Sequence, residues 1–163
     1  MSSWILLFSI QLYADYVSEH YREPIVVFDG YGQCSTKDMM KKRQSKGKTG
    51  SSVSFTLDMH LTTSKELFLN EISNKQRFIR SLGETLKANH CHVFHDTADA
   101  DLLIVKKAIV SSQTMETVIV GNDTDLLLLL IYHDPLDKNN LLFAPEPKKN
   151  SNGHIWDIKH VKN

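Results

Sequence analysis

Acidic residues follow three short apolar runs of the sequence, at the point where each run ends. They are Asp29 after Ile25–Phe28, then Asp96, Asp99 and Asp101 after His92–Phe94, and finally Asp123 and Asp125 after Val118–Val120. Crowded carboxylates disfavour one another's ionisation. A hard divalent cation, Mg²⁺ or Mn²⁺, removes that repulsion because it prefers oxygen ligands. The pattern predicts a two-metal site, in which ions about 4 Å apart stabilise the attacking and leaving oxygens of a phosphodiester displacement.

Each of these acidic residues, taken singly, also has a structural explanation. Asp99 and Asp101 fall in the first turn of a predicted helix, where the helix dipole favours a carboxylate. Asp123 precedes a leucine-rich run and occupies the position of a helix N-cap. Capping is the simpler interpretation of any one residue, whereas the recurrence of carboxylates after three apolar runs favours a shared site.

Alternating segments of the sequence predict the framework that positions these carboxylates. Strands are predicted at Ile25–Phe28, His92–Phe94 and Val118–Val120, with late edge strands at Leu141–Ala144 and Ile155–Ile158. Helices are predicted over 64–88, Asp96–Val110 and Leu126–Tyr132. We therefore expect an α/β protein, with three α/β/α layers around a mainly parallel sheet. The carboxyl ends of parallel strands lie at one edge of a sheet, so the carboxylates are expected to converge there.

Composition and hydropathy bound the class of protein. With 163 residues, of which 41% are hydrophobic and 23% charged, the chain is predicted to be a single globular domain over 1–163. The longest apolar runs, Trp4–Phe8 and Leu126–Tyr132, are too short to cross a bilayer. No secretory pattern opens the sequence, and Cys34 and Cys91 are typical of reduced thiols. We expect an intracellular protein without a membrane partner, in the nucleus or the cytoplasm.

Basic residues are concentrated in one segment, although the net charge of the whole chain is zero. The segment 35–54 is rich in Lys, Ser and Gly and lacks apolar periodicity, so we expect a mobile, exposed loop. A solvated loop and a phosphate-binding loop are both compatible with this composition.

Three motifs occur in a fixed order along the chain, over about residues 12–133. They are Val26-Val27-Phe28-Asp29-Gly30, then Ala98-Asp99-Ala100-Asp101, and then Val120-Gly121-Asn122-Asp123-Thr124-Asp125. Together with the basic segment and the long predicted helix between the first two, they resemble the PIN-like domain of the flap endonuclease superfamily. A helix suggested by Leu12, Tyr13, Tyr16 and Tyr21 also looks like the one that precedes the first motif in that family.

The resemblance implies a nuclease site and a nucleic-acid partner. It implies that Asp29, Asp99 and Asp101 hold one Mg²⁺ or Mn²⁺ ion, that Asp123 and Asp125 hold the second, and that water attacks the phosphorus of DNA or RNA. In the family, the segment after the first motif forms an arch over the scissile phosphate. The residues that the resemblance assigns to this contact are Lys37, Lys41, Lys42 and Arg43. Such contacts give affinity without sequence readout.

Two parts of the family pattern are missing from the sequence. The family's first strand, which ends in a catalytic Asp, should precede the helix around Tyr13, and its last metal-binding Asp should follow the late strands. We therefore expect the chain to cover the middle of the domain, with weak metal binding and slow or absent hydrolysis. The competing hypothesis is a non-catalytic PIN-like remnant that binds nucleic acid or a protein.

Two other patterns suggest different chemistry. Asp123-Thr124-Asp125 after a strand also fits the Asp-x-Asp motif of metal-dependent glycosyltransferases, but that interpretation leaves Asp29 and Asp99 unexplained. His90, Cys91, His92 and His95 suggest zinc. On a strand, however, successive side chains alternate between faces, and the spacing matches no common structural zinc pattern. We therefore expect no zinc site at these residues.

Overall fold

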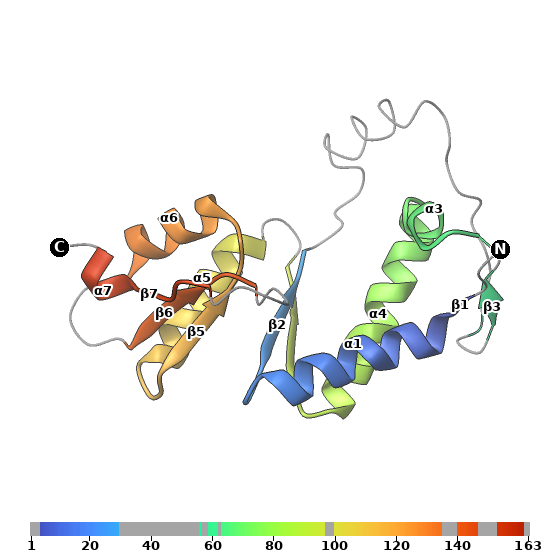
Figure 1. The fold of residues 1–163 in the computed structure, drawn as a ribbon, viewed down its shortest axis with the longest axis horizontal. Coiled ribbons are helices and arrows are strands. Elements are labelled where there is room, and N and C mark those ends of the chain that lie inside the picture. The colour runs from blue at the N-terminus through green and yellow to red at the C-terminus, as the bar shows by residue number, and fades with distance from the viewer. Residues whose placement is uncertain are drawn as a thin grey trace. The chain divides into compact units, whose positions relative to one another are not determined.

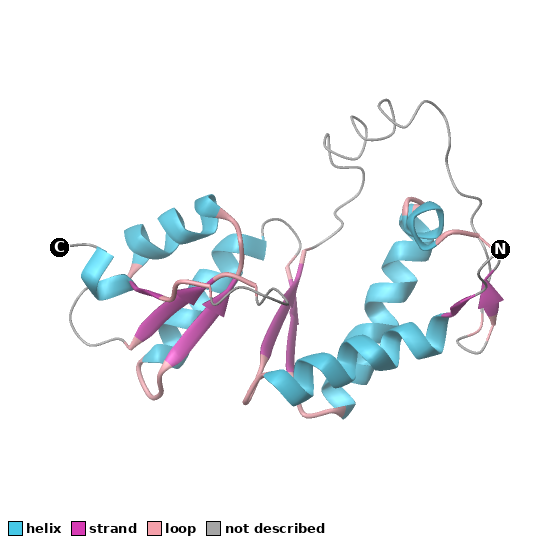
Figure 2. Cartoon of the chain, viewed as in Figure 1, coloured by secondary structure: helices cyan, strands magenta, loops and turns pink. Residues whose placement is uncertain are grey.

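The computed structural model describes residues 4–29, 56, 59–61, 63–96, 100–134, 140–146 and 153–161. The chain divides into two compact units, an N-terminal unit (Met1–Ala98) and a C-terminal unit (Asp99–Asn163). Each unit combines helices with small sheets, so the predicted α/β class is confirmed (Figures 1 and 2). The single domain predicted over 1–163 stays a prediction. None of the described helices combines the length and the hydropathy that a membrane span requires.

The N-terminal unit contains a pair of parallel strands. Strand β2 (Ile25–Phe28) pairs with β4 (His92–His95), with Ile25 opposite His92 and Phe28 opposite His95. Helices α1 (Leu6–His20) and α4 (Ile72–Ala88) lie beside this pair in Figure 1. The side chains between them form one core cluster, which consists of Ala14, Leu86 and Cys91 with Val17, Val26, Phe28, Leu82 and Val93. The helices therefore cover the face of the strand pair that carries Val26, Phe28 and Val93.

A second core cluster of the N-terminal unit lies nearer the start of α1. It joins Leu6 and Ile10 to Phe68 of α3 (Lys65–Leu69) and to Phe78 of α4. Leu6, Ile10 and Ala14 follow one another at intervals of four residues, so they form the buried stripe of α1. A short antiparallel pair, β1 (Trp4–Ile5) with β3 (His60–Leu61), completes the described part of this unit.

The long helix predicted over 64–88 is interrupted, which corrects the sequence-based prediction. Ser64 caps α3 by accepting a hydrogen bond from the Leu67 N–H at 3.2 Å, but α3 ends at Leu69 and α4 begins at Ile72. The side chain of Asn74, which is 1% exposed, donates to the carbonyl oxygen of Phe68 at 3.2 Å. Because that carbonyl lies in the last turn of α3, a buried side chain satisfies it where a continuing helix would have done so.

The C-terminal unit contains a three-stranded sheet in the order β5-β6-β7. Strand β5 (Thr117–Val120) runs parallel to β6 (Leu141–Ala144), and β7 (Trp156–Asp157) runs antiparallel to β6. The helices are α5 (Ala100–Ser112), α6 (Thr124–His133) and α7 (Ile158–Val161). One core cluster joins all of them and consists of Val105, Ala108, Ile119, Leu126, Leu130, Leu141, Phe143 and Ile158. The sheet and its helices thus share a single core.

Most predicted elements of both units are confirmed, although only Ile25–Phe28 and Leu141–Ala144 have the predicted bounds. Leu141–Ala144 was predicted as an edge strand, but it is the central strand of its sheet, because β5 and β7 pair with its two sides. Two of the differences at element ends have a local cause. The helix predicted from Asp96 begins at Ala100, because the Asp96 N–H instead donates to the Phe28 carbonyl at 3.1 Å and prolongs the strand pairing. The late strand predicted at Ile155–Ile158 is limited to Trp156–Asp157. The Asp157 carboxylate accepts from the Lys159 N–H at 3.0 Å, and α7 begins at Ile158.

Candidate metal and nucleic-acid site

Asp29 lies at the carboxyl end of β2 in the N-terminal unit, where its side chain is exposed. The hydrogen bond from the Asp96 N–H to the Phe28 carbonyl extends the parallel register by one residue. Asp29 and Asp96 therefore leave the strand pair as neighbours, at the same end of β2 and β4. Their position agrees with the rule that ligands bind at the carboxyl ends of parallel strands.

His95 lies directly before this strand end. Its ring stacks on the ring of Phe28, with a centroid distance of 5.2 Å and an interplanar angle of 21°. Gly83 of α4 lies next to the imidazole, because a Cβ built there would lie 3.4 Å from the His95 Nε2, which is an ordinary van der Waals contact. His95 directly precedes Asp96 in the sequence, and its exposed ring contacts Phe28 and lies next to Gly83 of α4.

Asp123 occupies the N-cap position of α6 in the C-terminal unit. Its backbone is extended, with φ −91° and ψ 123°, and its carboxylate accepts a hydrogen bond from the Asp125 N–H at 2.8 Å. The capping interpretation of Asp123 is therefore confirmed. The side chains of Asp123 and Asp125 are both exposed, so the cap leaves them accessible to solvent.

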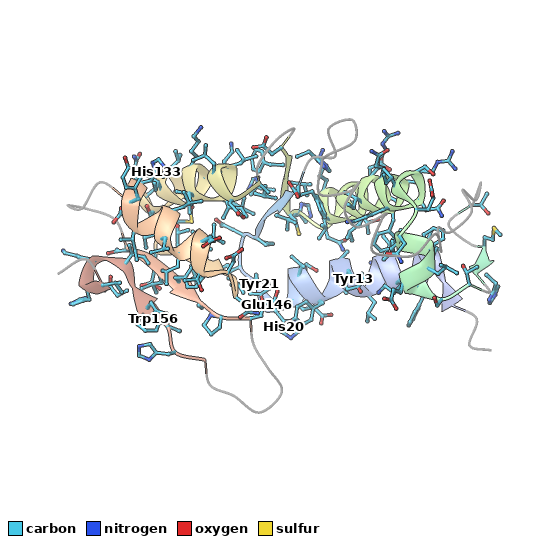
Figure 3. The ribbon with its side chains drawn as sticks, turned by 90° about the horizontal axis from the view of Figure 1, so that it is seen from above. Tyr13, His20, Tyr21, His133, Glu146 and Trp156 are labelled. Atoms are coloured by element: carbon cyan, nitrogen blue, oxygen red, sulfur yellow. The ribbon has the colours of Figure 1, made fainter. Side chains whose placement is uncertain are left out.

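Glu146 is a third acidic residue at this strand end, and the sequence analysis did not single it out. The Gly121 N–H donates to the Ala144 carbonyl at 2.9 Å, which continues the parallel pairing of β5 and β6. Beyond it, the Glu146 N–H donates to the Asn122 Oδ1 at 3.2 Å, and the Asn122 Nδ2 donates to the Glu146 Oε2 at 3.4 Å. Figure 3 labels Glu146. The sequence signal was present, because Glu146 follows the apolar run Leu141–Ala144 with only Pro145 between them.

The remaining predicted site residues are placed only in part. Asp101 lies half-buried in the first turn of α5, in agreement with the helix-dipole interpretation. Outside the described residues lie Asp99, Lys37, Lys41, Lys42, Arg43 and the whole segment 35–54. Within the described ranges, no group of three or more His, Cys, Asp or Glu side chains is arranged to hold a metal ion. The five-carboxylate site, with its two metal ions, therefore stays a prediction.

Among the ionisable side chains in the described ranges, those of Asp157 and Cys91 have clearly shifted pKa values, and both shifts have local causes. The His160 imidazole lies 2.8 Å from a carboxylate oxygen of Asp157, and this hydrogen bond lowers the pKa of Asp157, with help from the Lys159 N–H. Burial raises the pKa of the Cys91 thiol. A buried thiol with a raised pKa is a poor nucleophile, so Cys91 contributes to the core and not to the chemistry of the strand ends.

An apolar cavity of about 340 Å³ lies in the N-terminal unit. It is lined by Tyr13, Val17, Val26, Phe28, Lys65, Leu69, Lys75, Phe78, Ile79, Leu82 and Leu86. Its walls are almost entirely carbon, and it includes none of the strand-end carboxylates. Such walls offer little to a phosphate group, because an anion requires donors or cations around it.

Comparisons with protein-family models, with curated protein sequences and with solved structures gave no significant match.

Proposed function

We propose that this chain is a divalent-metal-dependent, nuclease-like domain that hydrolyses phosphodiester bonds in DNA or RNA, with slow turnover. The observation that supports it is the position of acidic residues at the carboxyl ends of parallel strands in both units. Asp29 and Asp96 follow the pair β2 and β4, and Asp123 and Glu146 follow the pair β5 and β6. We propose in addition the three-layer α/β/α arrangement of a PIN-like domain, with a mainly parallel sheet.

The donor set fits a hard cation, because every proposed ligand is a carboxylate. In this proposal Asp29, Asp99 and Asp101 hold one Mg²⁺ or Mn²⁺ ion, and Asp123 and Asp125 hold the other. Two bound ions would stabilise the charge that develops on the attacking and leaving oxygens of the phosphodiester.

The local contacts of the C-terminal strand end suit such a role for its carboxylates. The cap hydrogen bond holds the Asp123 side chain at the start of α6, and the Asn122–Glu146 pair joins the two strand ends. The N-terminus of α6 also favours negative side chains. The hydrogen bonds of Asp123 and of the Asn122–Glu146 pair reduce the conformational freedom that ligand binding would otherwise have to remove.

The proposed partner is DNA or RNA, recognised by structure and not by sequence. Lys37, Lys41, Lys42 and Arg43 are proposed to contact its phosphates. Contacts of this kind release counterions, so the affinity should fall steeply as the salt concentration rises.

A second candidate function is a non-catalytic PIN-like module that binds nucleic acid or a protein. The observation that favours it is the cap hydrogen bond of Asp123, because this bond gives a predicted metal ligand a purely structural use. The two candidates differ in whether the charge of Asp123 matters beyond the cap.

The substitution Asp123→Asn separates these candidates, because Asn caps a helix about as well as Asp but carries no charge. Flap, single-stranded and duplex DNA and RNA would be incubated with the full chain in Mn²⁺ and in Mg²⁺. Under the nuclease proposal, the parent protein cleaves slowly, and both Asp29→Asn and Asp123→Asn abolish cleavage. Asp15→Asn, a charge removal on α1, serves as the matched control and should cleave at the parental rate. Absence of cleavage by the parent, or cleavage that survives both strand-end substitutions, would refute hydrolysis at this site.

A further inference from the structure

Helix α1 carries aromatic side chains outside its buried stripe. Tyr13 and Tyr16 are each 41% exposed, and His20 is exposed at the end of the helix. These three residues are spaced by three and four positions, so they lie along one side of α1. Tyr21 directly follows the helix, and Figure 3 labels it together with Tyr13 and His20. We call Tyr13, Tyr16, His20 and Tyr21 the aromatic stripe.

The rings of the aromatic stripe are held in fixed orientations. Tyr16 and His20 stack with a centroid distance of 4.2 Å and an interplanar angle of 29°, and Tyr21 meets Tyr16 edge-on at 6.4 Å. The His20 Nδ1 lies 2.9 Å from the Tyr16 carbonyl oxygen, to which its N–H donates in that tautomer. Tyr13 packs edge-on against the buried Phe78 at 6.4 Å. Rings ordered in this way lose little conformational entropy when a ligand binds to them.

Cations accompany the rings at both ends of the aromatic stripe. Lys65 of α3 donates a hydrogen bond to the Tyr13 hydroxyl, and its Nζ lies 4.4 Å from the centroid of the Tyr13 ring. Arg22 directly follows Tyr21 and is exposed. Glu66 and Glu23 are the sequence neighbours of these cations, so the surface has no large excess of positive charge. Binding here must therefore depend more on the rings than on long-range attraction.

We propose that the aromatic stripe binds single-stranded nucleic acid, with bases stacked on its rings and phosphates beside Lys65 and Arg22. Every base has a planar face, and exposed rings beside cations are the usual platform for unpaired strands. Bases in a duplex are already stacked on one another, so the stripe should discriminate against duplex. This inference rests on the proposed function, of which it names the substrate class as single-stranded DNA or RNA.

Fluorescence anisotropy of a labelled oligothymidylate and of the matching RNA, in EDTA to prevent cleavage, tests the proposal. Tyr16→Leu should weaken binding about tenfold, which lies within the range for one stacked base. Tyr132→Leu is the matched control, because Tyr132 is 82% exposed on α6 of the other unit. Its affinity should equal that of the parent protein, and thermal melting would verify that both variants fold. Lys65→Met should weaken binding less than Tyr16→Leu, since it removes a cation and keeps the ring.

Repeating the titrations at high salt separates stacking from contacts made by the basic segment. Phosphate contacts weaken as the salt concentration rises, whereas the ratio between the affinities of the parent protein and Tyr16→Leu should stay the same. Equal affinity for a duplex of the same length, an unchanged affinity of Tyr16→Leu, or no binding of either single strand by the parent would overturn the proposal.

The same titrations distinguish a failure of this inference from a failure of the proposed function. If the parent does not cleave but loses binding on Tyr16→Leu, hydrolysis fails and the inference stands. If the parent cleaves and Tyr16→Leu both binds and cleaves normally, the inference fails alone.

Discussion

The strand ends of the two units carry similar residues in different surroundings. In the N-terminal unit, Asp29 follows β2 with an exposed side chain, and its neighbour across the strand pair is Asp96. In the C-terminal unit, Asp123 caps α6, and Asn122 is joined to Glu146 by two hydrogen bonds. An apolar run followed by Asp thus gives an exposed carboxylate in both cases, and Asp123 in addition caps a helix. Helix α6 begins at Thr124, directly after Asp123, whereas the residues that follow Asp29 lie outside the described part of the chain.

The largest expected effect tests whether the C-terminal strand end depends on its own core. Leu130 is fully buried where α6 packs on β5 and β6, so Leu130→Ala should lower the free energy of unfolding by about 2–5 kcal/mol. Leu128 on the same helix is 57% exposed, and Leu128→Ala should change it by less than about 0.5 kcal/mol. Denaturant unfolding measures the free energy of unfolding of both variants, and hydrogen exchange shows which segments lose protection. Equal loss of protection around β2 would show that the two strand ends unfold together.

The next effect isolates the cap that distinguishes the two strand ends. Asp123→Ala removes the acceptor for the Asp125 N–H and should destabilise the protein by about 0.5–2 kcal/mol. Asp123→Asn should be nearly neutral, because the amide oxygen replaces the acceptor. Asp29→Ala, at the other strand end, should also be nearly neutral. Thermal melting of the three variants measures these changes in stability. If Asp29→Ala destabilised the protein as much as Asp123→Ala does, the predicted difference between the two strand ends would be wrong.

A smaller effect, which is a gain in stability, is expected at Gly83 of α4, next to the N-terminal strand end. Gly83 lies inside α4, where a Cβ would meet the His95 Nε2 at 3.4 Å and the Val93 Cγ1 at 3.5 Å. These are ordinary contacts, and Ala is favoured over Gly inside a helix by about 0.5–1 kcal/mol. Gly83→Ala should therefore raise the melting temperature. A lower melting temperature would mean that the stacked His95 ring cannot move to accommodate the methyl group.

The smallest effect concerns Asp157, which caps α7 in the C-terminal unit. Its pKa is lowered by the hydrogen bond from His160, so the folded state favours the ionised carboxylate. The stabilisation is complete above the ordinary Asp pKa of about 3.9 and is lost as the pH falls through the lower folded value. A carboxyl titration followed by NMR should show Asp157 protonating below the ordinary Asp pKa of about 3.9. His160→Gln should move its midpoint upward, and an unmoved midpoint would contradict the assigned cause.

The strand-end pattern was the part of the candidate site that the sequence predicted best. Ile25–Phe28 and Leu141–Ala144 were predicted with the bounds that the structure has, because a short apolar run has few alternatives to a buried strand. Glu146 was missed since the rule was applied only to Asp residues. The break between α3 and α4 was missed for a different reason, because the apolar spacing continues across it. At the break, the Phe68 carbonyl accepts from the Asn74 side chain and from the Glu71 N–H, and the apolar spacing does not predict these contacts.

The sequence by itself determined the local elements and their caps, since periodicity and capping act within a few residues of the chain. Ser64 and Asp123 begin their helices through hydrogen bonds to residues two or three positions away. Only the tertiary structure decided which strands are neighbours and which side chains meet. The pairing of β2 with β4 joins residues more than sixty positions apart, and the contact of Lys65 with Tyr13 spans fifty-two. Such contacts depend on how several elements pack at once, and the spacing of residues along the chain does not encode that packing.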